Sequence, residues 1–388
     1  MPDILVTGGA GFIGANFVHY WLREHPTDRV VVLDGLTYAG NLASLKAAEG
    51  RPLYRFVHGD ICDTELVSAL LRKEALDSIV HFAAESHVDR SIVAPGEFIR
   101  TNVVGTHSLL EAARRVWLGE RRLAAHRFHH VSTDEVYGSL GPLDPPFSES
   151  TPYAPNSPYS ASKAASDHLV RAYHHTYGLA TTISNCSNNY GPYHFPEKLI
   201  PLMIVNLLQG LPLPIYGDGG NIRDWLYVED HCRGIELVLT KGKGGEVYNI
   251  GGRAECTNLE LVHRLCTIAD ETLKLHSDLA LRFPSCPASI GRSTATLMRF
   301  VKDRPGHDRR YAIDCTRIER DLGYKARVPL DQGLRATFAW FLENEHWWRG
   351  VMDGSYRQWI DTQYAIAPAD TGGRSLVPRT SGEGGLGA

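Results

Sequence analysis

A glycine-rich turn lies where the first strand expected in the chain gives way to the first helix. Gly8, Gly11 and Gly14 follow an apolar run over residues 3–7 and begin an amphipathic segment. In a nucleotide-binding turn one glycine permits the tight turn, one lets the backbone approach a pyrophosphate, and one packs helix against strand, while the helix N-terminus faces the anion. A glycine-rich turn can also bind nothing, so its context decides. The turn predicts that the chain begins with a βαβ unit.

The first half of the chain repeats this alternation of short apolar runs and amphipathic segments. Runs rich in Val, Ile, Leu, Phe or Thr predict strands over residues 3–7, 29–34, 54–58, 78–82, 127–132 and 180–185. Strands that alternate with helices form a parallel sheet covered on both faces. We therefore predict an α/β fold, a Rossmann-like doubly wound parallel sheet.

Beyond about Asn188 the sequence changes to Pro-rich and Gly-rich loops between shorter elements, which indicates a smaller lobe that closes over the sheet. A helix over 225–239 and a strand over 246–250 are expected to rejoin the first domain. The prediction is a first domain of 1–188 plus about 221–251, and a discontinuous second lobe of about 189–220 plus 252–364. Residues 365–388 are Gly-, Ser- and Thr-rich and are expected to form a disordered tail.

Composition narrows the class of protein. The 388 residues have 43% hydrophobic content, enough for one large or two moderate domains, and a formal net charge of -4. That charge gives no basic surface for nucleic acid. The seven cysteines are scattered without a Cys-x-x-Cys pair, which favours reduced thiols and no metal site. With no apolar run of membrane-spanning length, and a first strand too early to leave room for a signal peptide, we expect a cytoplasmic protein.

An acidic residue strengthens the interpretation of the glycine turn. Asp34 ends the second expected strand, about 20 residues past the turn, where a carboxylate hydrogen-bonds the ribose hydroxyls of a dinucleotide. The same carboxylate repels a 2′-phosphate, and Gly35 rather than an arginine follows it. We therefore predict NAD rather than NADP. Asp60 after the third strand is placed to meet the adenine, although such an Asp can equally cap a helix.

Tyr159 and Lys163 are four residues apart, and Pro158 before them suits a first helical turn, so both side chains share one face of a helix. An ammonium beside a phenol stabilises the phenolate, which makes Tyr159 a base for a sugar hydroxyl. Lys163 can also hold the nicotinamide ribose. A Tyr-x-x-x-Lys pattern is common on helix surfaces, but here it accompanies the glycine turn.

A second group of reactive residues follows the strand over 127–132. Thr133 is placed to bond the oxygen that Tyr159 deprotonates, and Asp134 and Glu135 come directly after it. The two carboxyls could simply cap the next helix, although capping needs only one of them. Two adjacent carboxyls in a partly closed cleft should have separated pKa values, one protonated as an acid and one ionised as a base. An acid and a base besides Tyr159 predict oxidation followed by elimination of water.

With these residues the chain resembles the extended short-chain dehydrogenases/reductases and, more narrowly, the dTDP-glucose 4,6-dehydratases. The resemblance covers most of residues 1–345 and rests on seven segments: DGLTYAGN (34–41), HFAAESHVDRS (81–91), STDEVYG (132–138), NCSNNYGP (185–192), FPEKLIP (195–201), RDWLYVEDH (223–231) and DRPGHDRRY (303–311). It implies one site that oxidises the C4 hydroxyl with NAD, removes the C5 proton through Glu135 while Asp134 protonates the C6 hydroxyl, and returns hydride to C6.

The resemblance also implies which residues bind each ligand. Those expected at NAD are Gly8, Gly11, Phe12, Ile13, Gly14, Asp34, Leu36, Thr37, Asp60, Ile61, Ala83, Ala84, Ser86, Thr101, Tyr159, Lys163 and Asn189. Those expected at the nucleotide sugar, in the second lobe and the cleft, are His87, Thr133, Asn188, Lys198, Leu199, Pro214, Tyr216, Arg223, Asn258, Arg304 and His307. A diphosphate is bound well by Lys and Arg side chains, and the second set contains Lys198, Arg223 and Arg304.

Four points stay open in the sequence. Residues 273–297 depart from the family pattern, which leaves the start of one wall of the nucleotide pocket unassigned. The family implies a homodimer through the helices after Thr101 and around Tyr159, but their apolar residues suit ordinary core packing equally well: Leu109, Leu110, Ala112, Ala113, Ala161, Ala164, Ala165 and Leu169. The alternatives to a dehydratase are a nucleotide-sugar 4-epimerase or decarboxylase, which has no use for the Asp134–Glu135 pair, and a catalytically silent NAD-binding protein. The sequence does not distinguish dTDP from UDP or CDP.

Overall fold

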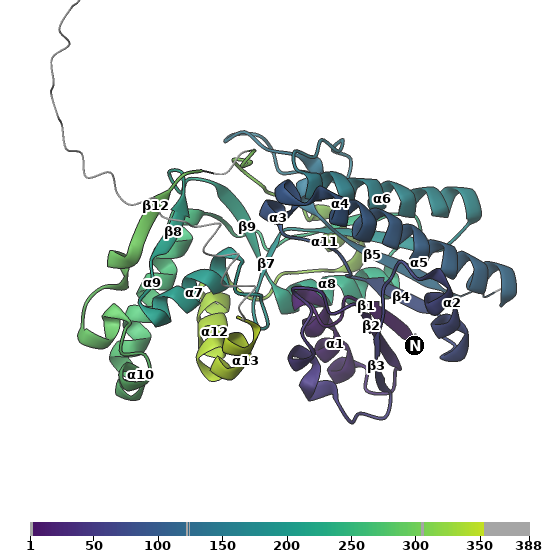
Figure 1. Cartoon of the computed structure of the whole chain (residues 1–388). Helices are drawn as coiled ribbons and strands as arrows, with labels where there is room; N and C mark the ends of the chain where they lie inside the picture. The colour runs from purple at the N-terminus through teal and green to yellow at the C-terminus, as the bar shows by residue number, and fades with distance from the viewer. Residues whose placement is uncertain (1–2, 122, 124, 304–305, 353–388) are drawn as a thin grey trace, which may run out of the picture.

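The computed structural model describes residues 3–121, 123, 125–303 and 306–352. Its centre is a seven-stranded sheet with parallel neighbours in the order β10-β6-β5-β4-β1-β2-β3 (Figure 1). The strands are β1 Ile4–Thr7, β2 Val30–Asp34, β3 Tyr54–His58, β4 Ser78–His81, β5 Arg127–Thr133, β6 Thr181–Cys186 and β10 Val247–Ile250. The predicted doubly wound α/β sheet is confirmed, and its first six strands start and end within a residue of the predicted bounds.

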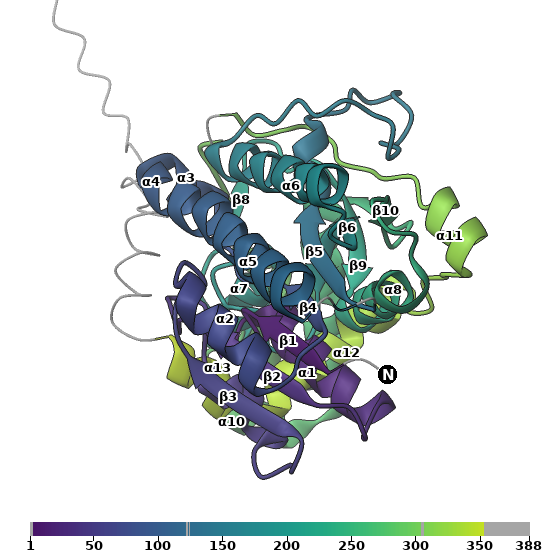
Figure 2. The same cartoon turned by 90° about the vertical axis from the view of Figure 1, so that its right-hand side faces the viewer.

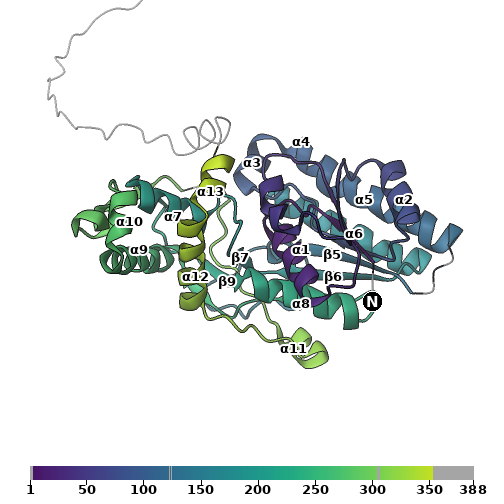
Figure 3. The same ribbon diagram turned by 90° about the horizontal axis from the view of Figure 1, so that it is seen from below.

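Helices cover both faces of this sheet. Helices α1 Phe12–Glu24 and α8 Val228–Lys241 lie on one face, and α2 Thr64–Lys73, α5 Thr106–Ala113 and α6 Pro158–Tyr177 lie on the other (Figures 2 and 3). Alternate residues of one strand enter opposite cores: Ile4 and Val6 pack with α1 and α8, whereas Leu5 packs with α2, α5 and α6. A strand buried on both faces needs a continuous apolar run, which is why the sequence showed no polar alternation there.

The predicted helix over 225–239 is wrong at its start. Trp225 lies in strand β9 Ile222–Tyr227, and the helix begins only at Val228. Strand β9 pairs with β7 Asn188–Tyr190 and with β11 Glu255–Thr257 in a separate three-stranded sheet. The apolar run Trp225–Val228 is compatible with a strand or with the start of a helix. Strand β9 forms because it pairs with β7 and β11, which lie far from it in the sequence.

The second lobe is a group of elements around its own hydrophobic core. It contains helices α7 Leu199–Gln209, α9 Asn258–Leu275, α12 Leu330–Glu343 and α13 Glu345–Val351, with strand β8 Leu213–Tyr216 paired in parallel to β12 Met298–Val301. Residues 273–297, which depart from the family pattern, form the end of α9, helix α10 Ser277–Arg282 and two 3-10 turns, Pro287–Ile290 and Thr294–Leu297. Leu273, Leu279, Phe283 and Cys286 in this segment pack into the core of the lobe.

The apolar residues of α5 and α6 were expected to pack either in a dimer or in the core. The apolar residues of α5, Leu109 to Ala113, are buried in the core of this same chain, so ordinary core packing accounts for them. On α6 Ala164 is also buried, Ala161 is exposed, and Ala165 and Leu169 are partly exposed.

The predicted tail over 365–388 lies outside the described residues. Among the helices of the described ranges, none is long and apolar enough to cross a membrane.

Candidate active site

A cleft of about 690 Å³ lies beyond the carboxyl ends of the central strands. The segments that follow β1, β2, β4, β5 and β6 line one side of it, and β8, β9 and the loop before α7 contribute from the second lobe. Ligands bind at this edge of doubly wound sheets because the loops there leave a crevice. Every predicted site residue lines the cleft except Leu36 and Arg304, and Arg304 lies outside the described residues.

The glycine turn is packed so closely against its own backbone and the loop after β4 that two of its glycines have no room for a side chain. A Cβ at Gly14 would lie 2.2 Å from the carbonyl oxygen of Gly8, and one at Gly8 would lie 2.5 Å from the amide nitrogen of Ala83. Gly8 also has φ of 70°, a conformation that other residues rarely adopt. Helix α1 begins after Gly11 with no side-chain cap and no acidic residue in its first turn. Its uncapped amide groups therefore suit a pyrophosphate.

Asp34 closes the other side of this turn. Its Oδ2 accepts a hydrogen bond from Ala10 N and its Oδ1 accepts one from Leu36 N, each at 2.8 Å. Burial raises the pKa of this carboxyl, and the two amide groups oppose that shift. Leu36 therefore holds Asp34 through its backbone instead of lining the cleft. Each carboxylate oxygen retains a second lone pair for a ribose hydroxyl.

Asp60 lies at the edge of the same cleft and does not cap a helix. Helix α2 is capped by Asp63, whose side chain accepts a hydrogen bond from Leu66 N. Asp60 instead accepts from Cys62 N at 2.9 Å and pairs with Arg100 at 2.5 Å. The carboxylate therefore keeps its position at the rim.

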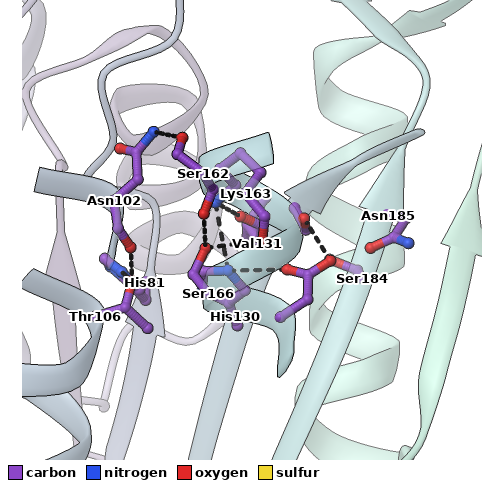
Figure 4. A network of polar contacts seen from close by, with 12 residues as sticks. His81, Asn102, Thr106, His130, Val131, Ser162, Lys163, Ser166, Ser184 and Asn185 are labelled. Carbon is purple, nitrogen blue, oxygen red and sulfur yellow. Dashed lines mark hydrogen bonds and ion pairs between the residues drawn. The ribbon is translucent and has the colours of Figure 1, made fainter. Parts of the chain in front are cut away.

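Helix α6 presents Tyr159 and Lys163 from its first turns. Ser157 and Ser160 form a capping box, and Pro158 occupies the first helical position, so the sequence fixes where this helix starts. Both side chains are buried in the wall of the cleft. Lys163 Nζ donates to the carbonyl oxygen of Val131 at 2.9 Å and lies 3.4 Å from His130 Nε2 (Figure 4).

The pKa of Tyr159 differs from the sequence expectation. Burial and the charge of Glu135 raise it well above its usual value, whereas a hydrogen bond with Thr133 lowers it. Lys163 was expected to lower this pKa, but its ammonium is hydrogen-bonded to Val131 on strand β5. In the protein alone, the Thr133 hydroxyl is the group that favours the phenolate.

The pair Asp134–Glu135 follows β5 in a 3-10 turn, Asp134–Tyr137. The cap of this turn is the Thr133 hydroxyl, which accepts from Glu135 N at 3.3 Å, so neither carboxyl serves as the cap. Asp134 is 1% exposed, and its Oδ2 has no hydrogen-bond partner among the described residues. Burial, then the charges of Glu135 and Asp224, raise its pKa well above the usual value. The raised pKa favours the protonated form of Asp134, in the direction that the sequence predicts for one of the two carboxyls, and Glu135 is partly exposed in the cleft beside it.

Basic and amide side chains line the far end of the cleft. Arg223 donates to the carbonyl oxygens of Ile222 at 2.7 Å and Asp308 at 3.0 Å, and its guanidinium lies 4.4 Å from the centre of the Tyr311 ring. Lys198 Nζ donates to the carbonyl oxygen of Ser86 at 2.9 Å. The buried side-chain oxygens of Asn188 and Asn258 have no hydrogen-bond partner among the described residues. These groups suit a polar ligand that carries negative charge.

Comparison with known proteins identifies the family. A family model described as GDP-mannose 4,6 dehydratase matches residues 5–337. The dTDP-glucose 4,6-dehydratases of Xanthomonas campestris pv. campestris (strain B100) and Neisseria meningitidis serogroup B are 56% and 54% identical over 359 residues, which cover 92% of this chain and 98% of each relative. The chain belongs to the dTDP-glucose 4,6-dehydratase family. The crystal structure of DesIV, the dTDP-glucose 4,6-dehydratase of Streptomyces venezuelae, with NAD bound, is 49% identical, has a TM-score of 0.79, and is matched over 90% of this chain and 99% of that one.

Sequence reasoning missed Tyr38, Glu197 and Tyr311, which line the cleft, and Arg90, which holds the first two together from outside it. Arg90 pairs with Glu197 at 3.0 Å, and its guanidinium lies 4.2 Å from the centre of the Tyr38 ring, so it joins the loop after β2 to the loop before α7. Tyr311 lines the cleft beside Arg223. All four residues lie inside the segments that carried the resemblance, so position within those segments was the available signal. Their contacts depend on loops far apart in the chain, which no local pattern predicts.

Proposed function

We propose that this protein is an NAD-dependent hydro-lyase that converts dTDP-glucose to dTDP-4-keto-6-deoxyglucose and water. The observation that carries the proposal is a buried Asp134 with a raised pKa next to Glu135, in the same cleft as Tyr159 and Lys163. A dehydrogenase needs only one base, and the second acid and base suit an elimination. The identity to relatives named dTDP-glucose 4,6-dehydratase supports the choice of sugar nucleotide.

NAD is proposed to bind along the glycine turn, Asp34 and the loops after β3 and β4. When bound, it accepts hydride from C4 of the sugar and later returns it to C6. The uncapped start of α1 supports a pyrophosphate there, and Asp34 supports an unphosphorylated ribose. The NAD-bound structure of DesIV supports the same cofactor.

The catalytic residues are proposed to act in sequence. Tyr159 takes the proton of the C4 hydroxyl, whose oxygen Thr133 also hydrogen-bonds, and the positive charge of bound NAD would favour the phenolate that this step requires. Glu135 then removes the C5 proton, which the new ketone has made acidic, while Asp134 gives its proton to the departing C6 hydroxyl and water leaves. Glu135, whose proton exchanges with solvent, protonates C5 when C6 is reduced. Tyr159 ends these steps with one proton more and Asp134 with one fewer, so the net charge is unchanged and proton exchange with solvent returns both residues to their starting states.

The second lobe and the cleft wall are proposed to hold the nucleotide sugar, with the sheet domain holding NAD. Arg223 and Lys198 supply positive charge for the diphosphate, and Arg304, outside the described residues, is expected to join them. The remaining contacts are proposed for His87, Asn188, Leu199, Pro214, Tyr216, Asn258 and His307.

We also propose a homodimer in the cytoplasm. Four large apolar side chains are exposed on the segment that leads into α5: Ile92, Val93, Ile99 and Val104. This segment lies beside α6 (Figure 2), and an exposed apolar patch of this kind suits a second copy of the chain. Light scattering of the purified protein tests the dimer.

The proposal of a cytoplasmic protein is supported by the cysteines. All seven are free thiols, which suits a reducing compartment.

The activity is tested with NAD-replete protein and two substrates, dTDP-glucose and UDP-glucose, with the products identified by NMR. The expected product is a 4-keto-6-deoxy sugar from dTDP-glucose, with deuterium at C5 when the reaction is run in D2O. A 4-epimer in place of the keto sugar would instead indicate the epimerase alternative. No product from any nucleotide glucose would reject the proposed function.

A further inference from the structure

A buried polar network lies beneath Tyr159 and Lys163, and its carboxylate Asp167 does not line the cleft. Asp167 is four residues after Lys163 on α6, and it is 2% exposed. Its Oδ2 accepts hydrogen bonds from the hydroxyls of Ser132 and Tyr153, both at 2.9 Å. Its Oδ1 lies 3.2 Å from His130 Nε2, the same nitrogen that lies 3.4 Å from Lys163 Nζ. One imidazole nitrogen therefore separates the carboxylate from the ammonium.

Among the groups around Lys163, we ask which can carry a negative charge opposite its ammonium. The titratable groups that interact electrostatically with Lys163 are Asp167 on its own helix, His81 on β4, His130 on β5 and Cys186 on β6, and Tyr159 lies one helical turn before it. Burial lowers the pKa of both histidines well below the usual value, so both are neutral. Burial likewise raises the pKa of the Cys186 thiol and of Tyr159.

Asp167 is left as the group that can carry the opposite charge. A buried ammonium without a counter-charge gives up its proton. Burial lowers the pKa of Lys163 to about 8, and Asp167 is the first of the groups that oppose this shift. Burial raises the pKa of Asp167 to about 6, and Lys163 is the first of the groups that oppose that shift. Both charges therefore coexist between about pH 6 and pH 8.

We propose that Asp167 is a positioning residue of the reaction, whose buried carboxylate keeps Lys163 charged and ties helix α6 to the end of strand β5. The tie runs through Ser132, which donates to Asp167 and directly precedes Thr133, Asp134 and Glu135. One carboxylate thus aligns the residues proposed for oxidation with those proposed for elimination. The inference rests on the proposed function for its role in catalysis, but the charge pairing is a property of the protein alone.

The test follows the Lys163 side chain directly by NMR in the NAD-bound enzyme. The chain contains nine lysines, so ε-carbon labelling gives few signals, and the Lys163 signal is the one lost in Lys163→Arg. In Asp167→Asn, which keeps the shape and a hydrogen-bond acceptor, the titration midpoint of Lys163 is expected to fall by one pH unit or more. In Tyr153→Phe, which removes one hydrogen bond but keeps the carboxylate, it is expected to stay at the wild-type value. An unchanged midpoint in Asp167→Asn would overturn the proposal.

A second measurement needs no variant. Because the pKa of Asp167 is raised to about 6, the wild-type Lys163 signal is expected to show a separate step near pH 6 as the carboxylate loses its proton. Absence of that step would also overturn the proposal, even if Asp167→Asn did not fold.

The kinetic consequence is a displaced pH profile of kcat with dTDP-glucose. The alkaline limb in Asp167→Asn should move to lower pH by the same amount as the Lys163 midpoint. A limb that moves by one pH unit lowers the rate on its alkaline side about tenfold. A loss of rate that is equal at every pH would show a structural role only and reject the proposal. If the wild-type protein made no product, the proposed function would fail, whereas the Lys163 titration would still decide the charge pairing.

Discussion

Replacement of Asp134 by asparagine is expected to stop the elimination and leave the oxidation at C4 intact. Asparagine has nearly the same shape but has no proton to give to the departing C6 hydroxyl. Asp134 is 1% exposed, and burial, Glu135 and Asp224 raise its pKa well above the usual value, which favours the uncharged form. The substitution therefore removes a proton donor without removing a charge.

The magnitude follows from these two facts. Loss of a general acid slows the step it serves by about 10² to 10⁴, which corresponds to about 3 to 5 kcal/mol in the barrier. The folded state should change by only about 1 kcal/mol, because the single hydrogen bond to Asp134 within the described residues is a long one of 3.4 Å from Thr133. Binding of NAD and of substrate should stay close to wild type.

The assay is a single turnover in D2O with NADH absorbance and NMR of the recovered sugar. In Asp134→Asn, NADH should appear and persist, C5 should acquire deuterium through Glu135, and C6 should keep its hydroxyl. In the matched variant Glu135→Gln, NADH should appear without deuterium at C5. A dehydration rate near wild type in Asp134→Asn, or a loss of NADH formation equal to the loss of dehydration, would refute the assignment of Asp134 as the acid.

The raised pKa of Asp134 gives an independent check through stability. The folded protein keeps this proton at pH values where the unfolded chain has lost it, so the contribution is complete below the unfolded pKa of about 4 and falls as pH rises through the folded value. Asp134→Asn has no such proton. Its melting temperature relative to wild type should therefore rise with pH, and a difference that is constant with pH would contradict the protonated state.

Three further predictions concern binding. Asp34→Asn should weaken NAD retention about tenfold, measured by the NAD content after dialysis, because a neutral amide replaces the carboxylate proposed at the ribose. Gly14→Ala should abolish NAD binding and lower the melting temperature, because its Cβ would lie 2.2 Å from the oxygen of Gly8; normal NAD content in this variant would contradict the geometry of the turn. Arg223→Lys should raise KM for dTDP-glucose about tenfold with little change in kcat, because lysine cannot keep two carbonyl contacts and the Tyr311 stack while it faces a diphosphate; an unchanged KM would place the diphosphate elsewhere.

Particular elements show how far the sequence could predict this fold and site. The first six strands were predictable because each is a continuous apolar run between turn residues, and the start of α6 was predictable from Pro158. Residues near Trp225 were misassigned because a short apolar run fits a strand or a helix, and the partners of β9 lie about thirty residues away on either side. Leu36 was assigned to the ligand from its motif, although the structure uses its amide to hold Asp34.

What the sequence determined by itself is local: a glycine turn whose spacing no side chain could fill, a sheet whose strands are apolar throughout, and the types of residue that stand at the ends of those strands. What only the tertiary structure decided is the chemical state of those residues. Burial and two other carboxyls raise the pKa of Asp134, and Asp167, packed beneath Lys163, opposes the lowering of the Lys163 pKa by burial. Protonation depends on the distance to other charges and to water, and those distances exist only once β5, β6 and α6 have packed together.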